Sequence, residues 1–339
     1  DEALAAQAAE RGVRVIPKSA SAMAEAGALS FDFLFSIANL DMLPEAMIAA
    51  ARAMAINFHD GPLPRYAGLN ATSWAILNGE DRHGVTWHEM TPKADAGGIV
   101  AAEAVSIDPN ETALSLNAKC FEAGFAGFRT VLDQIAAGGV RAMPQEGERS
   151  YFGRGKRPAA LATLAFDAPA ARTSALVRAL TFEPYANPLA SAKLWTGARL
   201  LLVSAAHITE GAATPGTVLA IDSQSVTIAC ADGALRLSDL TDLAGEAVDL
   251  SQDAGLKVGA VLPALSPEQA AHIDRLGKAA AKSEAFWLQQ SAGAHAIDSP
   301  YPRARRGAVA AHEFPLGAAT AEQAGAALAA WATRVSGVR

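Results

Sequence analysis

A short polar segment, Asn57-Phe58-His59-Asp60, is followed directly by a turn rich in Gly and Pro. Imidazole titrates near neutral pH, so His59 could act as a general acid or base. Asn57 and His59 are two positions apart, and two such residues on a strand point to the same side. Together they could polarise a carbonyl group and stabilise a developing oxyanion. The segment therefore indicates a site that acts on a carbonyl compound.

Each of these residues also has an ordinary structural interpretation. An isolated His after a strand is more often a donor to a loop carbonyl, and Asn commonly ends a strand. Asp60 could simply cap the turn. Asp95, in the Gly-rich loop Lys93–Gly98, is also typical of turn chemistry. None of these residues identifies a catalytic site alone.

The hydrophobic pattern predicts the elements that position these residues. Met54-Ala55-Ile56 is expected to be a buried strand and Leu69 to Leu77 a helix. A strand that ends in polar groups before a helix is where an open α/β sheet usually places its chemistry. Two more strands are predicted from Gly84 to Met90 and from Ile99 to Ile107, so Asp95 would lie in the loop between them.

The remaining pattern up to about residue 138 also alternates between strands and helices, which indicates an α/β sheet. Strands are predicted for Val13–Ile16 and for the aromatic run Phe31–Ala38, and a short helix for Ser21–Ala26. A long helix should follow Thr112 and end near Ala137. The residues expected on its buried face are Leu114, Leu116, Phe121, Phe125, Phe128, Val131 and Leu132.

The second half of the chain has a different pattern. A basic segment, Tyr151–Pro158, is predicted to be a linker, and a helix is expected from about Pro169 to Leu180. Regularly spaced short strands separated by turn residues then favour a small β-barrel. These strands are expected at Ala198–Ser204, Thr217–Ala220, Ser225–Cys230 and Ala234–Leu237. After Gly259 a helical tail is expected, beginning with a helix from Pro267 to Ala280.

The composition is that of a globular protein: 51% of the 339 residues are hydrophobic and 19% are charged. That length allows two domains. The net charge of −7 argues against a nucleic-acid partner. Two widely separated cysteines, Cys120 and Cys230, favour a reducing compartment. The sequence shows neither an apolar run long enough to span a membrane nor a signal peptide, so we expect a cytoplasmic protein.

Other kinds of site find little support in the sequence. The histidines outside the polar segment lack partners at metal-ligand spacing, so no metal is expected. His88, on a predicted strand, is interpreted as a packed or rim residue. The chain has no GxGxxG or P-loop motif and no Ser or Cys in a nucleophile elbow.

Three features together resemble the folate-dependent formyltransferases. They are Asn57-Phe58-His59, the run from Pro62 to Gly68, and Asp95 ahead of Gly97-Gly98 at the spacing found in that family. The resemblance covers roughly residues 5 to 255 and implies a Rossmann-like sheet in residues 1–150. It also implies an OB-like β-barrel in residues 151–255. Within that range, Phe182–Pro188 resembles a segment of the family's second domain.

The sequence departs from the family pattern in two ways. The Asp60-Gly61-Pro62 variant of the turn resembles formyltransferase domains that begin nonribosomal peptide synthetases. Residues 256–339, with Ser283–Trp287 and Ser299–Arg303, resemble an inter-domain segment of such synthetases. The family's first strand, following helix and second strand have no clear counterpart, so a sheet truncated at its N-terminus is expected.

The resemblance implies a 10-formyltetrahydrofolate co-substrate and a catalytic set of Asn57, His59 and Asp95. Asn57 and Asp95 would orient the formyl group and a water, and His59 would stabilise the oxyanion and relay protons. The pterin would lie against apolar side chains and the loop that carries Asp95. The residues implied in folate binding are Leu40, Met42, Leu43, Thr91, Pro92 and Asp95.

Three hypotheses for the function are left open, two of which name an acceptor for the formyl group. An aminoacyl group on a carrier protein is preferred, with adjacent synthetase domains as partners. A sugar amine or other small amine is the second hypothesis. A catalytically silent domain used as a scaffold or interaction module is the third.

Overall fold

The computed structural model describes residues 2–16, 29–185, 187–284, 286–287, 320, 322–323 and 325–328. The chain divides into two compact units, Asp1–Ala281 and Lys282–Arg339. All elements discussed below belong to the first unit. The predicted helix Ser21–Ala26 and the Ser299–Arg303 segment lie outside the described residues.

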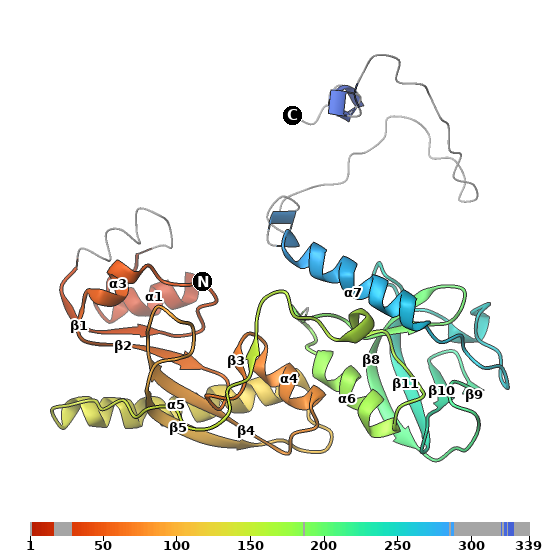
Figure 1. The fold of residues 1–339 in the computed structure, drawn as a ribbon, viewed down its shortest axis with the longest axis horizontal. Coiled ribbons are helices and arrows are strands. Elements are labelled where there is room, and N and C mark those ends of the chain that lie inside the picture. Colours follow the sequence, from red (N-terminus) through yellow and green to blue (C-terminus); the bar gives the residue numbers. More distant parts are fainter. Residues whose placement is uncertain are drawn as a thin grey trace. The chain divides into compact units, whose positions relative to one another are not determined.

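The first domain is built on a four-stranded mixed sheet, whose strand order is β1-β2-β4-β5 (Figure 1). Its strands are β1 (Phe31–Ser36), β2 (Ala51–His59), β4 (Arg82–Glu89) and β5 (Ile99–Ser106). A short helix, α3 (Glu45–Ala49), connects β1 to β2, and these two strands are parallel. The other pairings are antiparallel. The predicted α/β class is therefore confirmed, and the sheet holds both strands that flank the Asp95 loop.

The N-terminal part differs from the sequence prediction. Glu2–Glu10 forms helix α1, but Val13–Ile16 is not a strand. Val13 and Val15 are about half exposed, and no strand among the described residues pairs with this segment. β1 ends at Ser36, and most of its side chains are only partly buried. It is an edge strand among the described residues, and its side chains are less buried than its apolar sequence predicts.

The long helix α5 (Ala113–Ala136) packs against β4 and β5. Its bounds agree with the prediction, but its buried face does not. Leu116 and Val131 are buried, whereas Phe121, Phe125 and Leu132 are exposed. The helix residues that meet the sheet include Gly124 and Gly127.

The large side chains at this interface come from the sheet instead. A Cβ added at Gly124 would lie 2.6 Å from the Phe58 ring, and one at Gly127 would lie 2.9 Å from Trp87. Bulky sheet residues therefore require small helix residues opposite them. The helix sequence alone does not show that its glycines lie opposite large side chains of the sheet.

Two short strands, β3 (Ala67–Gly68) and β6 (Tyr151–Phe152), pair in parallel ahead of helix α4 (Ala71–Leu77). The Phe152 ring stacks between those of Tyr66 and Trp74, with centroid distances of 5.4 and 4.8 Å. The start of the segment predicted as a linker is thus part of the first domain.

The second domain contains a 3-10 turn, η1 (Ala159–Ala162), helix α6 (Ala170–Leu180) and a five-stranded antiparallel sheet in the order β7-β8-β11-β10-β9. The strands are β7 (Lys193–Trp195), β8 (Leu200–Thr209), β9 (Val218–Ile221), β10 (Ser225–Ala229) and β11 (Ala234–Thr241). β7 and β9 are the two edges and do not pair with each other among the described residues. The OB-like barrel is therefore not confirmed.

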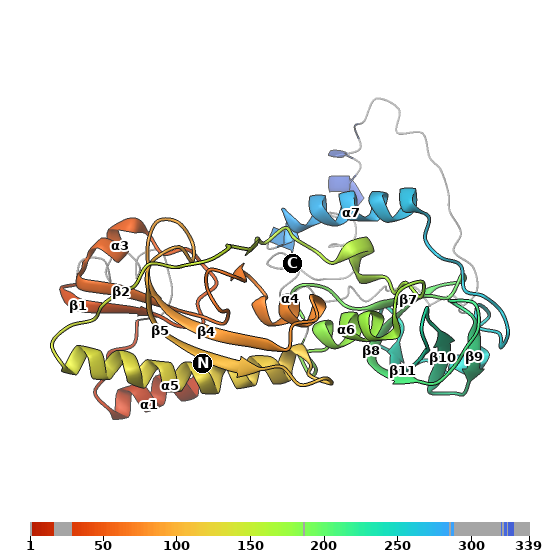
Figure 2. The same cartoon turned by 60° about the horizontal axis from the view of Figure 1, so that its bottom comes forward.

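Two further helices follow the second sheet. They are the short 3-10 turn η2 (Leu250–Gln252) and helix α7 (Pro267–Ala281). α7 crosses η1, as Figure 2 shows, and Gly277 packs against the Leu161 side chain. The first predicted helix of the tail thus packs on the second domain. In the part of the chain that the structure describes, no helix is long and apolar enough to cross a membrane.

Candidate active site

His59 is the last residue of β2, and its side chain is only 5% exposed. Its Nε2 lies 2.8 Å from the carbonyl oxygen of Tyr66. A carbonyl oxygen can only accept a hydrogen bond, so Nε2 carries a hydrogen and donates it. In the neutral ring Nδ1 therefore has the lone pair. That atom lies 3.9 Å from a carboxylate oxygen of Asp60 and 3.9 Å from one of Asp95.

Asp95 faces His59 from the loop between β4 and β5. Its Oδ2 accepts a hydrogen bond of 2.8 Å from the Gly68 backbone, and its Oδ1 lies 3.4 Å from His88 Nε2. Burial raises the pKa of this carboxyl, but His88, the charge of His59 and the Gly68 amide together outweigh burial and lower the pKa to about 2. Asp95 is therefore ionised at neutral pH.

His88 belongs to this site, although the sequence interpretation treated it as a packed or rim residue. It lies opposite Asn57 in the antiparallel pairing of β2 and β4. Its Nδ1 donates to the Glu89 carbonyl at 2.8 Å, so in the neutral ring Nε2 accepts from the Asn57 amide at 3.2 Å. A protonated Nε2 could instead donate to Asp95. The signal that finds His88 is strand register, which the sequence alone does not supply.

Asn57, as predicted, is on the same strand as His59 and lines the same cavity. Its amide nitrogen also lies 3.0 Å from the Phe58 carbonyl oxygen. The structure thus brings together all three residues of the predicted catalytic set.

The turn after His59 fits tightly around the imidazole. A Cβ added at Gly61 would lie 2.7 Å from His59 Nε2, so any side chain there would displace the ring. The Thr86 hydroxyl donates to the Gly61 carbonyl at 2.8 Å and accepts from the Leu63 amide at 3.2 Å. The Gly/Pro turn is therefore fixed to β4, the same strand that holds His88.

Further polar side chains support the turn that follows His59. His83 Nε2 donates to the Asp60 carbonyl at 2.8 Å, and burial lowers the pKa of His83. The Tyr66 hydroxyl donates to Glu80 at 2.7 Å, and Glu80 also pairs with Arg65. Burial, with the hydrogen bond to Glu80, raises the pKa of Tyr66 to about 12. These contacts hold the turn between Asp60 and Tyr66, and the positions of His59 and Asp60 depend on that turn.

The site opens into a cavity of about 530 Å³. Of the residues implied in folate binding, Leu40, Met42, Leu43, Thr91 and Asp95 line it. Pro92 does not: it is exposed and lies outside the lining, because the loop turns its ring to solvent. Ile48 and Met90, which the sequence interpretation did not select, extend the apolar wall.

The rest of the lining mixes apolar side chains, such as Phe121 and Phe182, with polar ones from other elements. It includes Thr72, Ser73, Asn117, Tyr151, Arg154 and Asn187. The Asn187 amide donates to the Ser73 hydroxyl and to the Ala179 carbonyl, both at 3.2 Å. This connection brings the Phe182–Pro188 segment to the cavity, so the second domain forms part of its wall.

Among the described residues, no group of three His, Cys, Asp or Glu side chains is arranged to hold a metal ion. The groups that converge on the cavity include hydrogen-bond donors and acceptors and the carboxylates of Asp41, Asp60 and Asp95. Such a set can polarise a carbonyl, stabilise an oxyanion and move a proton.

Comparison with protein families identifies the class. Residues 13–132 match the family model described as formyl transferase, and residues 159–254 match that of the formyl transferase C-terminal domain. Together the two matches span more than half of the chain, and the chain belongs to the formyltransferase family.

Solved structures show the same fold. HypX from Aquifex aeolicus, in complex with tetrahydrofolic acid, matches with a TM-score of 0.52 and 22% identity, over 62% of this chain and 36% of that one. This chain thus spans well under half the length of HypX. An N-formyltransferase from Helicobacter canadensis, in complex with folinic acid and dTDP-3-aminofucose, matches with a TM-score of 0.53 and 20% identity, over 69% and 81%. WlaRD, a sugar 3N-formyl transferase, has a TM-score of 0.52 and 19% identity, over 68% and 78%.

Proposed function

We propose that this protein transfers a formyl group from 10-formyltetrahydrofolate to an amine. The observation that carries the proposal is the convergence of Asn57, His59 and ionised Asp95 on one cavity. The donor is proposed because the chain belongs to the formyltransferase family and because the three similar structures are described with folate compounds.

The geometry supports a division of roles among these residues. The amine nitrogen attacks the formyl carbon, a new C–N bond forms, and the carbonyl oxygen becomes an oxyanion. The Asn57 amide would donate a hydrogen bond to that oxygen in place of one of its two present acceptors, the Phe58 carbonyl and His88 Nε2. The bond from the carbon to N10 of the folate then breaks, and N10 takes up a proton as the amine loses one.

His59 is placed to move that proton. Its Nε2 is engaged with the Tyr66 carbonyl, so Nδ1 is the atom that can accept a proton from the amine and return it to N10. Asp95, 3.9 Å away and ionised, stabilises the positive charge of the ring between these two steps. A protonated His88 Nε2 would donate to Asp95 and favour its ionised form, whereas a neutral Nε2 accepts from Asn57 and orients that amide.

The apolar wall formed by Leu40, Met42 and Leu43 suits the pterin ring. Leu40 and Met42 are 73% and 64% exposed, so a flat ring laid over them would remove apolar surface from water. The loop at Thr91 would contribute polar contacts at the edge of the ring.

For the acceptor, we favour a sugar amine over an aminoacyl group on a carrier protein. Two of the similar proteins are described as acting on or binding amino sugars. Outside the residues implied in folate binding, the lining includes the hydroxyl and amide groups of Thr72, Ser73, Asn117, Tyr151 and Asn187, which could bind a polyhydroxyl acceptor. The carrier-protein acceptor and synthetase partners rest on the sequence resemblance alone. The silent-scaffold alternative is disfavoured by the ordered hydrogen bonds of the site.

The division into residues 1–150, 151–255 and 256–339 also remains our proposal. The pairing of β6 with β3 attaches Tyr151 and Phe152 to the first domain. The packing of α7 on η1 attaches part of the third segment to the second domain.

The proposal is tested by mixing the protein with 10-formyltetrahydrofolate and following tetrahydrofolate formation with two acceptors. One is a dTDP-amino sugar and the other an aminoacyl group on a carrier protein. Formation with the amino sugar supports our choice, and formation only with the carrier protein reverses it. If neither acceptor is formylated and calorimetry detects no folate binding, the scaffold alternative is correct.

A further inference from the structure

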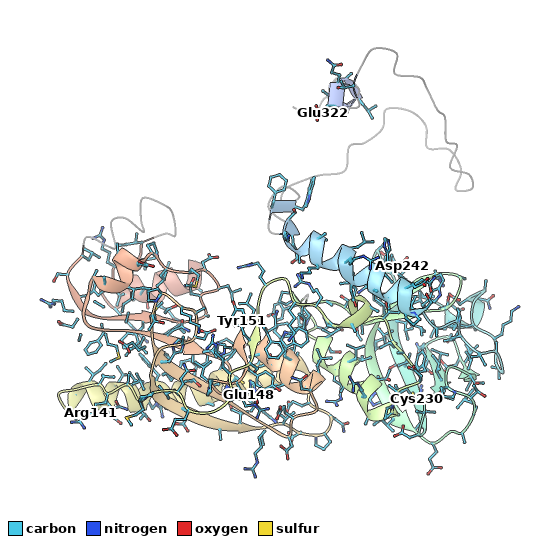
Figure 3. All side chains as sticks on the ribbon, in the orientation of Figure 1. Arg141, Glu148, Tyr151, Cys230, Asp242 and Glu322 are labelled. Carbon is cyan, nitrogen blue, oxygen red and sulfur yellow. The ribbon has the colours of Figure 1, made fainter. Side chains whose placement is uncertain are left out.

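Residues 143–152, which we call the brace, run beside both halves of the catalytic site. Figure 3 labels Arg141, near the far end of α5, and Tyr151, beside β3, so the brace crosses the first domain between them. At its start, Met143 exchanges two backbone hydrogen bonds with Ile99 on β5, at 2.7 and 2.8 Å. At its end it forms β6. Between these anchors its side chains contact the site loops.

The first contact is with the backbone of the Asp95 loop. Arg149 donates from one guanidinium nitrogen to the Asp95 carbonyl at 2.6 Å and from the other to the Ala94 carbonyl at 2.9 Å. Gln145 donates to the Asp95 carbonyl at 3.1 Å and to the Gly97 carbonyl at 2.8 Å. Four hydrogen bonds thus hold three carbonyls of one loop.

This loop needs outside support because Asp95 has a left-handed backbone, with φ of +50°. Residues other than Gly adopt this conformation only occasionally, although Asp tolerates it better than most. It persists only where the surroundings impose it. It also directs the Asp95 carboxylate toward His59 and His88. Relaxation of this backbone would therefore move the carboxylate out of the site.

The second contact is with the His59 side of the site. The Ser150 hydroxyl accepts a hydrogen bond of 2.8 Å from the Tyr66 amide, and the Tyr66 carbonyl is the acceptor of His59 Nε2. The Ser150 carbonyl accepts from Ala67 at 3.1 Å. Arg149 and Ser150 are neighbours in sequence, so one short segment holds both Asp95 and the partner of His59.

We propose that Arg149 is a positioning residue, assisted by Gln145, that fixes the Asp95 carboxylate relative to His59 by clamping the Asp95 backbone. The proposal rests on the proposed formyl transfer. Arg149 touches neither substrate nor the reacting atoms, and it acts through Asp95. Its two donors diverge from a planar guanidinium to adjacent carbonyls, a geometry that Lys cannot reproduce.

The test compares Arg149→Ala, Arg149→Lys and Gln145→Ala with the unchanged chain. The matched control is Arg178→Ala, because Arg178 also donates to a backbone carbonyl, that of Glu111 at 2.8 Å, and lies outside the cavity lining. Each variant is assayed for kcat, for the folate donor's KM and for the pH profile. Deuterium exchange of the peptide covering residues 91–98 is measured on the same samples.

Arg149→Ala and Arg149→Lys should both lower kcat by about 10²-fold, since misplacing a reacting group by about 1 Å has an effect of that size. Gln145→Ala should have a smaller effect in the same direction. The acid limb of the pH profile should move to higher pH, because Asp95 would lose the contacts with His88, His59 and the Gly68 amide that lower its pKa. Exchange in residues 91–98 should rise. Arg178→Ala should leave all four measurements unchanged.

Three results would overturn the proposal. One is wild-type kcat and wild-type loop exchange in Arg149→Ala, and another is full rescue by Arg149→Lys. The third is an equal loss in Arg178→Ala, which would indicate general destabilisation. Failure of the proposed function gives a different result, because the unchanged chain would then show no turnover while the exchange comparison would still report whether Arg149 holds the loop.

Discussion

The carbonyl oxygen of Tyr66 accepts a hydrogen bond from His59 Nε2 at 2.8 Å, and this bond determines which imidazole nitrogen faces Asp95. Tyr66 is held in turn by Ser150 and by its hydroxyl contact with Glu80. A loop residue without a chemical role of its own thus sets the orientation of the proposed proton-transfer group.

Replacing His88 should affect the site through Asp95. In His88→Ala the carboxyl loses the largest interaction that lowers its pKa but stays buried, so its pKa should rise toward or above the ordinary value. We expect kcat to fall at least tenfold and the acid limb of the pH profile to move to higher pH. An unchanged profile measured between pH 3 and 8 would show that His88 does not act on Asp95.

Asp95 should make protein stability depend on pH in a defined direction. Its folded-state pKa of about 2 lies below the ordinary 3.8, so its ionised form stabilises the fold at neutral pH. This pKa difference corresponds to a contribution of about 2 kcal/mol to the free energy of unfolding. The contribution is fully present above the pKa of the unfolded state and is lost as the pH falls through the pKa of the folded state. Urea unfolding of the unchanged chain and Asp95→Asn should therefore differ most at pH 6–7, and the gap should narrow toward pH 3. A gap that is constant with pH would contradict this expectation.

Gly68 should not tolerate a side chain. Its φ is +103°, and an added Cβ would lie 2.3 Å from the Phe152 carbonyl oxygen. Gly68→Ala should lower the free energy of unfolding by about 1–3 kcal/mol and weaken the Gly68–Asp95 hydrogen bond. Gly155→Ala is the control, since nothing lies within 4 Å of a Cβ built there. Equal urea midpoints for the two variants would refute the prediction.

Arg154 is the one Lys or Arg among the described residues that line the cavity. If the acceptor is an amino sugar on a nucleotide, its phosphates are the anionic group that Arg154 can bind. Arg154→Ala should raise KM for that acceptor about tenfold and leave KM for the folate unchanged. The exposed Arg172 provides a control for net charge. A rise in the folate KM alone would assign Arg154 to the donor side.

The sequence predicts those parts of the site that depend on local order. Asn57 and His59 share a face because they are two apart on one strand, and Asp95 is recognised by its spacing. His88, Arg149 and Gln145 could not be predicted, because their roles depend on strand register and on a contact more than 50 residues away in the chain. The exposure of Phe125 on α5 could not be predicted for a similar reason. The large side chains between this helix and the sheet are Phe58 and Trp87, which belong to the sheet.

The second domain shows the limit of strand counting. Four short strands with regular turns are found at β8, β9, β10 and β11, close to the predicted positions. Whether their sheet closes depends on pairing between its edge strands, and turn signals do not encode that pairing.

The most direct test of the proposed centre is the rate of tetrahydrofolate formation by Asn57→Ala, His59→Ala and Asp95→Asn, each checked for folding and for folate affinity by calorimetry. We predict that each variant loses at least about 10²-fold in kcat. The folate Kd should change little in Asn57→Ala and His59→Ala, whereas Asp95→Asn should also raise it, because Asp95 is among the residues implied in folate binding. Wild-type turnover in a folded Asn57→Ala or His59→Ala would contradict the assignment of this site.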